Sequence, residues 1–199
     1  MIPISLDPRF VRVAVAGNGP LALRRLRALR AAGAENALLF SDTPDDAAVA
    51  IAGASLRRNM PDATDLADLH AIWIVDLPRD VAEALATRAR GQRLLINVED
   101  VLPLCDFHSV AEVRRGDLLL TVSTNGRAPG LASMIRRNLE LRYGPEWGDR
   151  VEEIGALRAS WQRDGVAMPE AARRIAAIVA DRKWLCDRVC DFAERQTLG

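Results

Sequence analysis

The stretch from Phe10 to Ala22, FVRVAVAGNGPLA, limits the possible fold of this chain more than any other segment. Its first seven residues are rich in β-branched side chains, which predicts a buried strand, and glycines end that strand abruptly. Apolar residues then recur at helical spacing as far as Ala32, where Gly33 follows as a stop. A strand that runs through glycines into a helix is typical of the start of a Rossmann-type domain, although glycines after a strand also mark simple turns.

The residues of this loop fit the contacts that a dinucleotide needs. Gly17 allows the tight turn, Gly19 lets the backbone approach a pyrophosphate, and Ala22 keeps the helix close to the strand. The N–H groups of the first helical turn and the helix dipole then face the phosphates. The predicted cofactor-binding residues here are Gly17, Asn18, Gly19, Pro20, Leu21 and Ala22.

Further apolar segments alternate with helical or turn segments up to residue 98. Strands are expected at 36–40, 54–58, 71–75 and 94–98, with a helix at 81–90. This alternation predicts a parallel, doubly wound α/β sheet whose ligand lies beyond the C-terminal ends of the strands. The polar residues at those ends complete the predicted site: Ser41, Asp42, Asp76, Asn97 and Asp100.

Asp42 has two readings. It lies roughly 25 residues after Gly17, close to the spacing at which an acidic residue accepts hydrogen bonds from the adenosine ribose. A carboxylate there would repel a 2′-phosphate, so this reading favours NAD over NADP. The other reading is that Asp42 caps the turn formed by residues 43–46.

The organisation changes after Pro103. We expect a hairpin of 109–115 with 117–123, a turn at 124–129, an amphipathic helix at 130–142, and tail helices at 147–163 and 169–194. A hairpin and one helix are too small to hold a core alone, which favours a dimer interface. The predicted domains are a dinucleotide-binding domain at 1–104, a dimerisation and substrate unit at 105–145, and a helical domain at 146–199.

Charge and cysteine content exclude several classes of protein. Lys and Arg number 27, as do Asp and Glu, so no overall field favours nucleic acid or an anionic membrane. No segment has the length of a membrane span, and the first residues lack a signal-peptide pattern. Three sparse cysteines, Cys105, Cys186 and Cys190, favour a reducing cytoplasm, and we expect thiols rather than a metal site.

Three segments together resemble one family. GNGPLALRRLRALRAAGA is similar to a GGGxVAxRK-type opening, INVEDVLPLCDF to an NVxDxxxLCxF segment, and LLLTVSTNGRAPGLASMIRRNLE to a strand–SxxGxxP–helix segment. The three patterns are those of the precorrin-2 dehydrogenase/sirohydrochlorin ferrochelatase family, the N-terminal module of siroheme synthase, which this chain therefore resembles. The resemblance implies a homodimer that oxidises the tetrapyrrole precorrin-2 to sirohydrochlorin with NAD⁺; some members also insert Fe²⁺. Rival readings are another tetrapyrrole redox or chelatase activity, and a non-catalytic dimer that senses a dinucleotide or tetrapyrrole.

The resemblance also assigns roles to residues. The aspartate of its NVxD motif falls on Asp100, which would act as a base or orient the macrocycle, with Asn97 beside it. In a chelatase the same carboxylate would guide a pyrrole proton or the metal. The predicted substrate-binding residues are Ser123, Thr124, Asn125, Gly126 and Arg127.

Arginines cluster around the predicted hairpin, turn and helix. A tetrapyrrole with acetate and propionate arms suits guanidinium groups, which bind carboxylates bidentately. An ordinary charged surface is the alternative explanation. The arginines in question are Arg114, Arg115, Arg127, Arg136 and Arg137.

Overall fold

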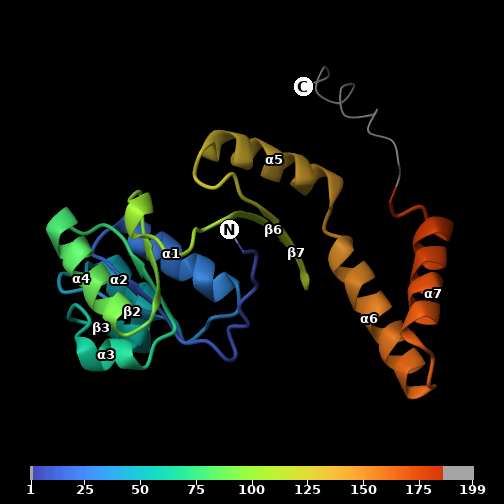
Figure 1. Ribbon diagram of the computed structural model, residues 1–199, viewed down its shortest axis with the longest axis horizontal. Coiled ribbons are helices and arrows are strands. Elements are labelled where there is room, and N and C mark those ends of the chain that lie inside the picture. Colours follow the sequence, from blue (N-terminus) through green and yellow to red (C-terminus); the bar gives the residue numbers. More distant parts are fainter. Residues whose placement is uncertain (1, 186–199) are drawn as a thin grey trace. The chain divides into compact units, whose positions relative to one another are not determined.

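The computed structural model describes residues 2–185 and divides into two compact units (Figure 1). The first contains the chain up to Val110 together with Ser123–Leu131, and the second contains Ala111–Val122 and the chain from Ala132 onward. This division differs from the predicted three parts in two respects. The hairpin shares a unit with the tail helices, and the turn that was predicted to bind substrate belongs to the first unit.

Five parallel strands form the sheet of the first unit, in the order β3-β2-β1-β4-β5. Their bounds are β1 Val13–Ala16, β2 Leu38–Phe40, β3 Leu56–Arg57, β4 Ala71–Ile74 and β5 Leu95–Val98. Val15 pairs with Leu39 on one side and Trp73 on the other, and Trp73 pairs in turn with Asn97. This topology confirms the predicted doubly wound α/β class.

Helices cover both faces of this sheet. Alternate strand residues such as Val15 pack against α1 (Pro20–Ala31) and α2 (Asp46–Ala52), while the intervening ones, such as Ile72, pack against α3 (Ala63–Ala67) and α4 (Arg79–Gly91). All four residues of β1 and of β4 are buried. Strands buried on both faces explain why their sequences are continuous apolar runs rather than alternating ones.

The short helices α2 and α3 were not predicted. Each begins at an aspartate that caps its first turn: Asp45 accepts a hydrogen bond from the Ala48 N–H at 2.7 Å, and Asp62 forms a capping box with Asp65. The predicted strand at 54–58 is only Leu56–Arg57, because the 3₁₀ turn η1, Gly53–Ser55, occupies its start.

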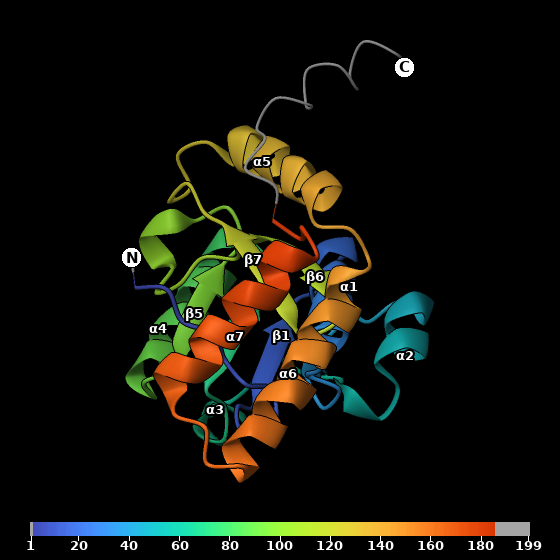
Figure 2. The same cartoon turned by 90° about the vertical axis from the view of Figure 1, so that its right-hand side faces the viewer.

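The second unit consists of a hairpin and helices. The antiparallel strands β6 (Ala111–Arg115) and β7 (Leu118–Val122) turn at Gly116, which has a φ of 55°. The helix α5 spans Pro129–Arg142, and its residues after Leu131 belong to this unit. The helices α6 (Trp147–Arg163) and α7 (Met168–Asp181) lie side by side (Figures 1 and 2).

The last predicted helix is shorter than expected within the described residues. It was predicted to run to Glu194, but α7 ends at Asp181, and Lys183 has a φ of 53°, which is incompatible with a continuing helix. Cys186, Cys190 and the rest of that predicted helix lie outside the described residues.

Candidate dinucleotide and substrate site

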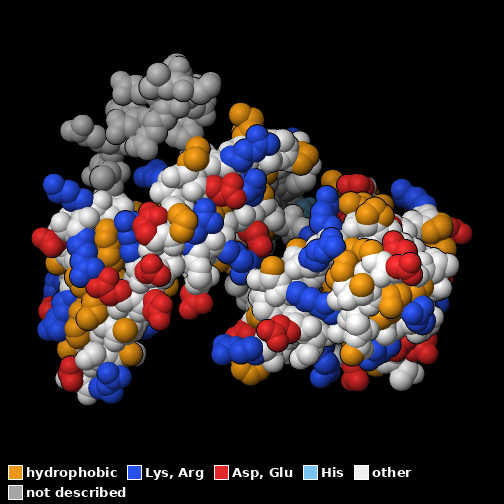
Figure 3. Space-filling model, turned by 180° about the vertical axis from the view of Figure 1, so that it is seen from behind, with side chains coloured by type: hydrophobic (Ala, Val, Ile, Leu, Met, Phe, Trp, Pro, Cys, Tyr) orange, Lys and Arg blue, Asp and Glu red, His pale blue; other side chains and the backbone are white. Residues whose placement is uncertain are grey.

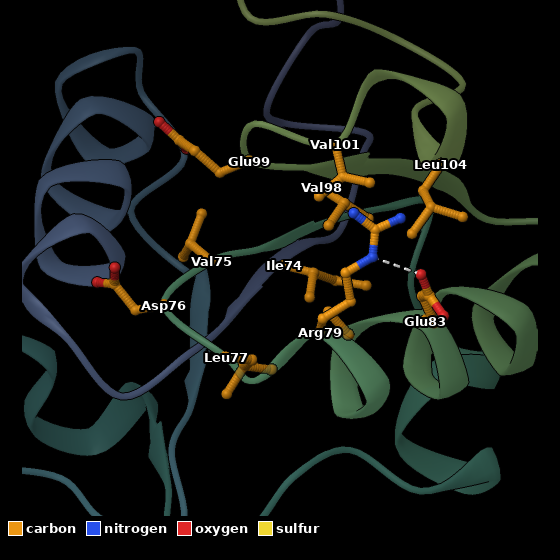
Figure 4. Close-up of a pocket in the computed structure, with 11 residues that line it drawn as sticks. Ile74, Val75, Asp76, Leu77, Arg79, Glu83, Val98, Glu99, Val101 and Leu104 are labelled. Atoms are coloured by element: carbon orange, nitrogen blue, oxygen red, sulfur yellow. Dashed lines mark hydrogen bonds and ion pairs between the residues drawn. The ribbon is translucent and has the colours of Figure 1, made fainter.

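The candidate site lies at the C-terminal ends of β1 and β4, where the winding of the sheet reverses. β1 leads into α1 on one face and β4 leads into α4 on the other, which is the arrangement at which a doubly wound sheet binds its ligand. In this region, the ends of β4 and β5 and the first turn of α4 border a pocket of about 120 Å³. Figure 4 shows Val75, Asp76 and Leu77 on one side of this pocket, with Glu99 above Val75, and Val98, Val101 and Leu104 on the other side.

The two loop glycines are needed because neither position has room for a side chain. A Cβ atom at Gly17 would lie 2.0 Å from the carbonyl oxygen of Val75. A Cβ atom at Gly19 would lie 2.4 Å from Oδ2 of Asp76. The loop therefore approaches the end of β4 closely, and the atoms nearest to these two glycines belong to Val75 and Asp76.

Asn18 links the glycine loop to the end of β2. Its amide nitrogen donates a hydrogen bond to Oδ1 of Asp42 at 2.8 Å, and its amide oxygen accepts one from the Ser41 hydroxyl at 2.7 Å. Ser41 is buried and Asp42 is exposed. The capping role in the following turn belongs to Asp45, so the Asp42 carboxylate is fixed by Asn18 at the strand end.

The Asp76 carboxylate accepts hydrogen bonds from backbone N–H groups at the N-terminus of α1. Its Oδ2 accepts the N–H of Leu21 at 2.7 Å and that of Ala22 at 3.3 Å. In Figure 4 its side chain turns toward the N-terminal end of the blue helix, α1. The first-turn amides that were predicted to face phosphates therefore face this carboxylate.

Asn97 is buried and anchors the chain that follows β5. Its amide nitrogen donates to the carbonyl oxygen of Phe107 at 2.9 Å and lies 3.7 Å from Sγ of Cys105. The Phe107 ring meets Trp73 edge to face with ring centroids 4.9 Å apart, and the Trp73 indole N–H donates to the Ser109 hydroxyl. The Asn97 amide nitrogen thus has a structural partner within the domain.

Asp100 and Glu99, adjacent in sequence, differ in their surroundings. Asp100 is exposed, has a left-handed φ of 62°, and no group within residues 2–185 forms a hydrogen bond or ion pair with its carboxylate. Glu99 lines the pocket and pairs with Arg24 at 3.1 Å and with Arg25 at 3.0 Å. Neither Glu99 nor these two arginines was singled out from the sequence as a site residue, yet only 19% of the Arg25 side chain is exposed.

The predicted substrate-binding turn belongs to the same unit as the sheet. Its Ser123 and Thr124 hydroxyls accept hydrogen bonds from the backbone of Asn125 and Ala128, each at 3.2 Å. Asn125 and Gly126 have φ values of 55° and 72°, and a Cβ atom at Gly126 would lie 3.1 Å from the Leu102 methyl groups. Leu102 begins η2 (Leu102–Leu104), two residues after Asp100. The turn is therefore brought next to the segment that follows the predicted catalytic residue.

The five predicted anion-binding arginines fall into two groups. Arg115 donates to the Tyr143 carbonyl at 2.9 Å, Arg114 pairs with Glu112, and Arg136 pairs with Glu140 within α5. Arg127 and Arg137 are exposed, and within residues 2–185 their side chains have no such partner. Both remain available for a ligand.

The sheet order, the glycine loop at the winding reversal and the acidic residue after β2 define a dinucleotide-binding protein of the Rossmann class. The chain belongs to the family described as putative NAD(P)-binding, which it matches over residues 4–111. Residues 115–141 match the family described as sirohaem biosynthesis protein central. The two matches follow one another along the chain and confirm the family predicted from three sequence segments.

Similar proteins carry the same assignment. The siroheme biosynthesis protein met8 of Schizosaccharomyces pombe is 40% identical over 85 residues, which cover 43% of this chain and 32% of that protein. The siroheme synthase of Methylococcus capsulatus is 31% identical over 176 residues, covering 87% of this chain and 36% of the relative. The chain thus spans about a third of the length of these curated relatives. The structure of SirC, precorrin-2 dehydrogenase, shares the fold with a TM-score of 0.70 and 22% identity, over 94% of this chain and 93% of that one.

Proposed function

We propose that this protein oxidises precorrin-2 to sirohydrochlorin with NAD⁺ in the biosynthesis of sirohaem. The observation that carries this proposal is the succession of an NAD(P)-binding family match and a sirohaem biosynthesis match in one chain. The reaction removes two hydrogens from precorrin-2: a hydride passes to NAD⁺, giving NADH, and a proton passes to a base.

The glycine loop and the end of β2 are the proposed dinucleotide contacts. Gly17 allows the loop to pack against the end of β4, where a Cβ atom would meet the Val75 carbonyl, and Gly19 is the loop position at which the backbone approaches a pyrophosphate in dinucleotide-binding domains. Asp42, oriented by Asn18, accepts hydrogen bonds from the adenosine ribose and disfavours a 2′-phosphate. NAD⁺ is therefore the proposed cofactor, and its nicotinamide supplies the hydride acceptor.

Asp100 is the proposed base. Asp100 lies two residues after the end of β5, has a left-handed backbone conformation, and stands between Glu99 and Val101, which both line the pocket. Its exposed carboxylate has no partner within residues 2–185, so it can accept a proton or a hydrogen bond from a substrate. Glu99 is unsuited to this role because two arginines already pair with it.

The turn at Ser123–Arg127 is the proposed substrate contact. It packs against Leu102, so it lies in the same unit as Asp100 and the dinucleotide loop. The Arg127 guanidinium, which has no partner within residues 2–185, matches the acetate and propionate arms of the substrate.

We further propose that the protein is a homodimer. In the described part of the second unit few side chains are buried, and the buried apolar ones are Val113, Ala132 and Ala171. On α5, Leu131 is 52% exposed, Met134 66% and Leu141 73%. Apolar side chains are also visible between charged ones on the tail helices in Figure 3. A second copy of the chain would bury this surface.

We place the protein in the cytoplasm. Cys105, the cysteine within the described residues, is a free thiol, as expected in a reducing compartment. In the described part of the chain, no helix is long and apolar enough to cross a membrane.

The test is an anaerobic incubation of the purified protein with precorrin-2 and NAD⁺, followed through the absorbance of NADH and of the product. The proposal predicts one NADH for each sirohydrochlorin. Binding of both compounds without formation of NADH would instead support the non-catalytic sensing role. A second incubation with Fe²⁺ or Co²⁺ then tests whether the protein also inserts a metal.

A further inference from the structure

We infer that the Asp76 carboxylate is an internal competitor of the dinucleotide pyrophosphate and thereby lowers the affinity of this protein for NAD⁺. The inference rests on the proposed function, because it concerns the cofactor of the same site. It reverses the favourable cofactor contact that the sequence suggested for Asp76.

The first observation is that Asp76 occupies the donors that a phosphate would use. The N–H groups of Leu21 and Ala22 lie in the first turn of α1 and donate to Oδ2 of Asp76, at 2.7 and 3.3 Å. The Ala22 N–H is shared with the Gly19 carbonyl at 3.2 Å, so the Leu21 N–H is the donor that Asp76 occupies most fully. The N-terminus of a helix attracts anions through its free N–H groups and its dipole. A carboxylate and a phosphate cannot both be bound by the same pair of donors.

The second observation concerns space. The three atoms nearest to a Cβ built at Gly19 all belong to the Asp76 side chain, at 2.4, 2.6 and 2.8 Å. The second glycine of a G-x-G loop is the position at which the backbone approaches a pyrophosphate. The gap beside Gly19 is thus filled by a negatively charged group of the protein itself.

The third observation is that few contacts hold the carboxylate in place. Asp76 is exposed and has a left-handed φ of 52°, and within residues 2–185 no cation pairs with it. Arg79, three residues further along, pairs instead with Glu83 at 2.6 Å (Figure 4). The bonds from Leu21 and Ala22 are therefore the contacts that the carboxylate gives up when a phosphate displaces it.

Two substitutions separate charge from hydrogen bonding. D76N keeps an oxygen that can cap α1 but removes the negative charge, and D76A removes both. Each should bind NAD⁺ about tenfold more tightly than the wild type, which corresponds to about 1.4 kcal/mol. The matched control is D80N, which removes a charge from the first turn of α4, away from the α1 donors.

The experiment is calorimetric titration of the wild type, D76N, D76A and D80N with NAD⁺ and with ADP-ribose, with circular dichroism to check that each is folded. Tighter binding of both ligands by D76N and D76A, with D80N unchanged, supports the inference. Equal or weaker binding by D76N and D76A, with a wild type that binds, overturns the inference and leaves the proposed function intact. Absence of binding by all four folded proteins overturns the proposed function as well.

Discussion

The carboxylate of Glu99 at the end of β5 lies 3.0 Å from the guanidinium of Arg25 in α1, and both side chains are more than four-fifths buried. These residues are 74 positions apart in the sequence. The pair ties the segment that carries Asp100 to the helix that follows the dinucleotide loop. It is therefore both a stabilising contact and a constraint on the candidate site.

We expect E99Q to destabilise the protein because it leaves the Arg25 guanidinium without its counter-charge. Removal of one member of a partly buried, hydrogen-bonded pair should cost about 1–3 kcal/mol. Urea denaturation followed by circular dichroism measures this loss. The control is E83Q, which breaks an exposed pair with Arg79 on α4 and should cost less than about 0.5 kcal/mol. Equal losses in the two variants would contradict the structural role of Glu99.

The Asp42 carboxylate should decide between NAD⁺ and NADP⁺. D42A removes the acceptor for the ribose hydroxyls and the repulsion of a 2′-phosphate, so we expect NAD⁺ affinity to fall about tenfold while the preference over NADP⁺ shrinks. Calorimetric titration with both cofactors measures the ratio of their dissociation constants. D46N, an exposed charge removed in the first turn of α2, serves as the control. An unchanged ratio in D42A would exclude Asp42 from cofactor selection.

We expect Arg127 to contribute to binding of the tetrapyrrole and not to binding of the dinucleotide. R127A is expected to weaken the binding of sirohydrochlorin about tenfold, because a guanidinium–carboxylate contact is lost, and to leave NAD⁺ binding unchanged. Anaerobic absorbance titration measures the affinity for sirohydrochlorin, and calorimetry measures the affinity for NAD⁺. R114A is the matched control, since Arg114 already pairs with Glu112. Equal losses of both ligands in R127A would refute this division of roles.

The Cys105 thiol should react slowly in the folded protein. Burial raises its pKa, and the thiol donates to the Val98 carbonyl at 3.2 Å. Native protein at mildly alkaline pH should therefore be alkylated by iodoacetamide more slowly at Cys105 than protein in urea, as measured by mass spectrometry of the peptide containing it. Similar rates in the two states would contradict this.

The raised pKa of Cys105 also determines how the free energy of unfolding changes with pH. The folded state holds the Cys105 proton more tightly than the unfolded state, so this contribution to stability is complete below the ordinary thiol pKa. It declines as the pH rises through the higher pKa of the folded state. A free energy of unfolding that increased over that range in the wild type, but not in C105A, would contradict the assignment.

The sequence was sufficient for features that depend on local pattern. Apolar runs located β1, β4 and β5, of which the first ends at a glycine, and the spacing from Gly17 pointed to Asp42 after β2. The helices α2 and α3 were missed because they are short, although the capping aspartates Asp45 and Asp62 carried a usable signal.

Features that depend on long-range packing could not be predicted from the sequence. Asp76 meets Leu21 across 55 residues, and that contact exists only because β4 lies beside β1. The placement of the turn at Ser123–Arg127 likewise depends on Gly126 fitting against Leu102. Sequence periodicity describes the faces of single elements, and it does not state which side chain of one element meets which of another.

The most direct test of the account compares wild type with D100A in the anaerobic reaction with precorrin-2 and NAD⁺. We expect D100A to bind NAD⁺ as tightly as the wild type and to form NADH at least about a hundredfold more slowly, the effect expected from loss of a general base. Formation of NADH by D100A at the wild-type rate would contradict it.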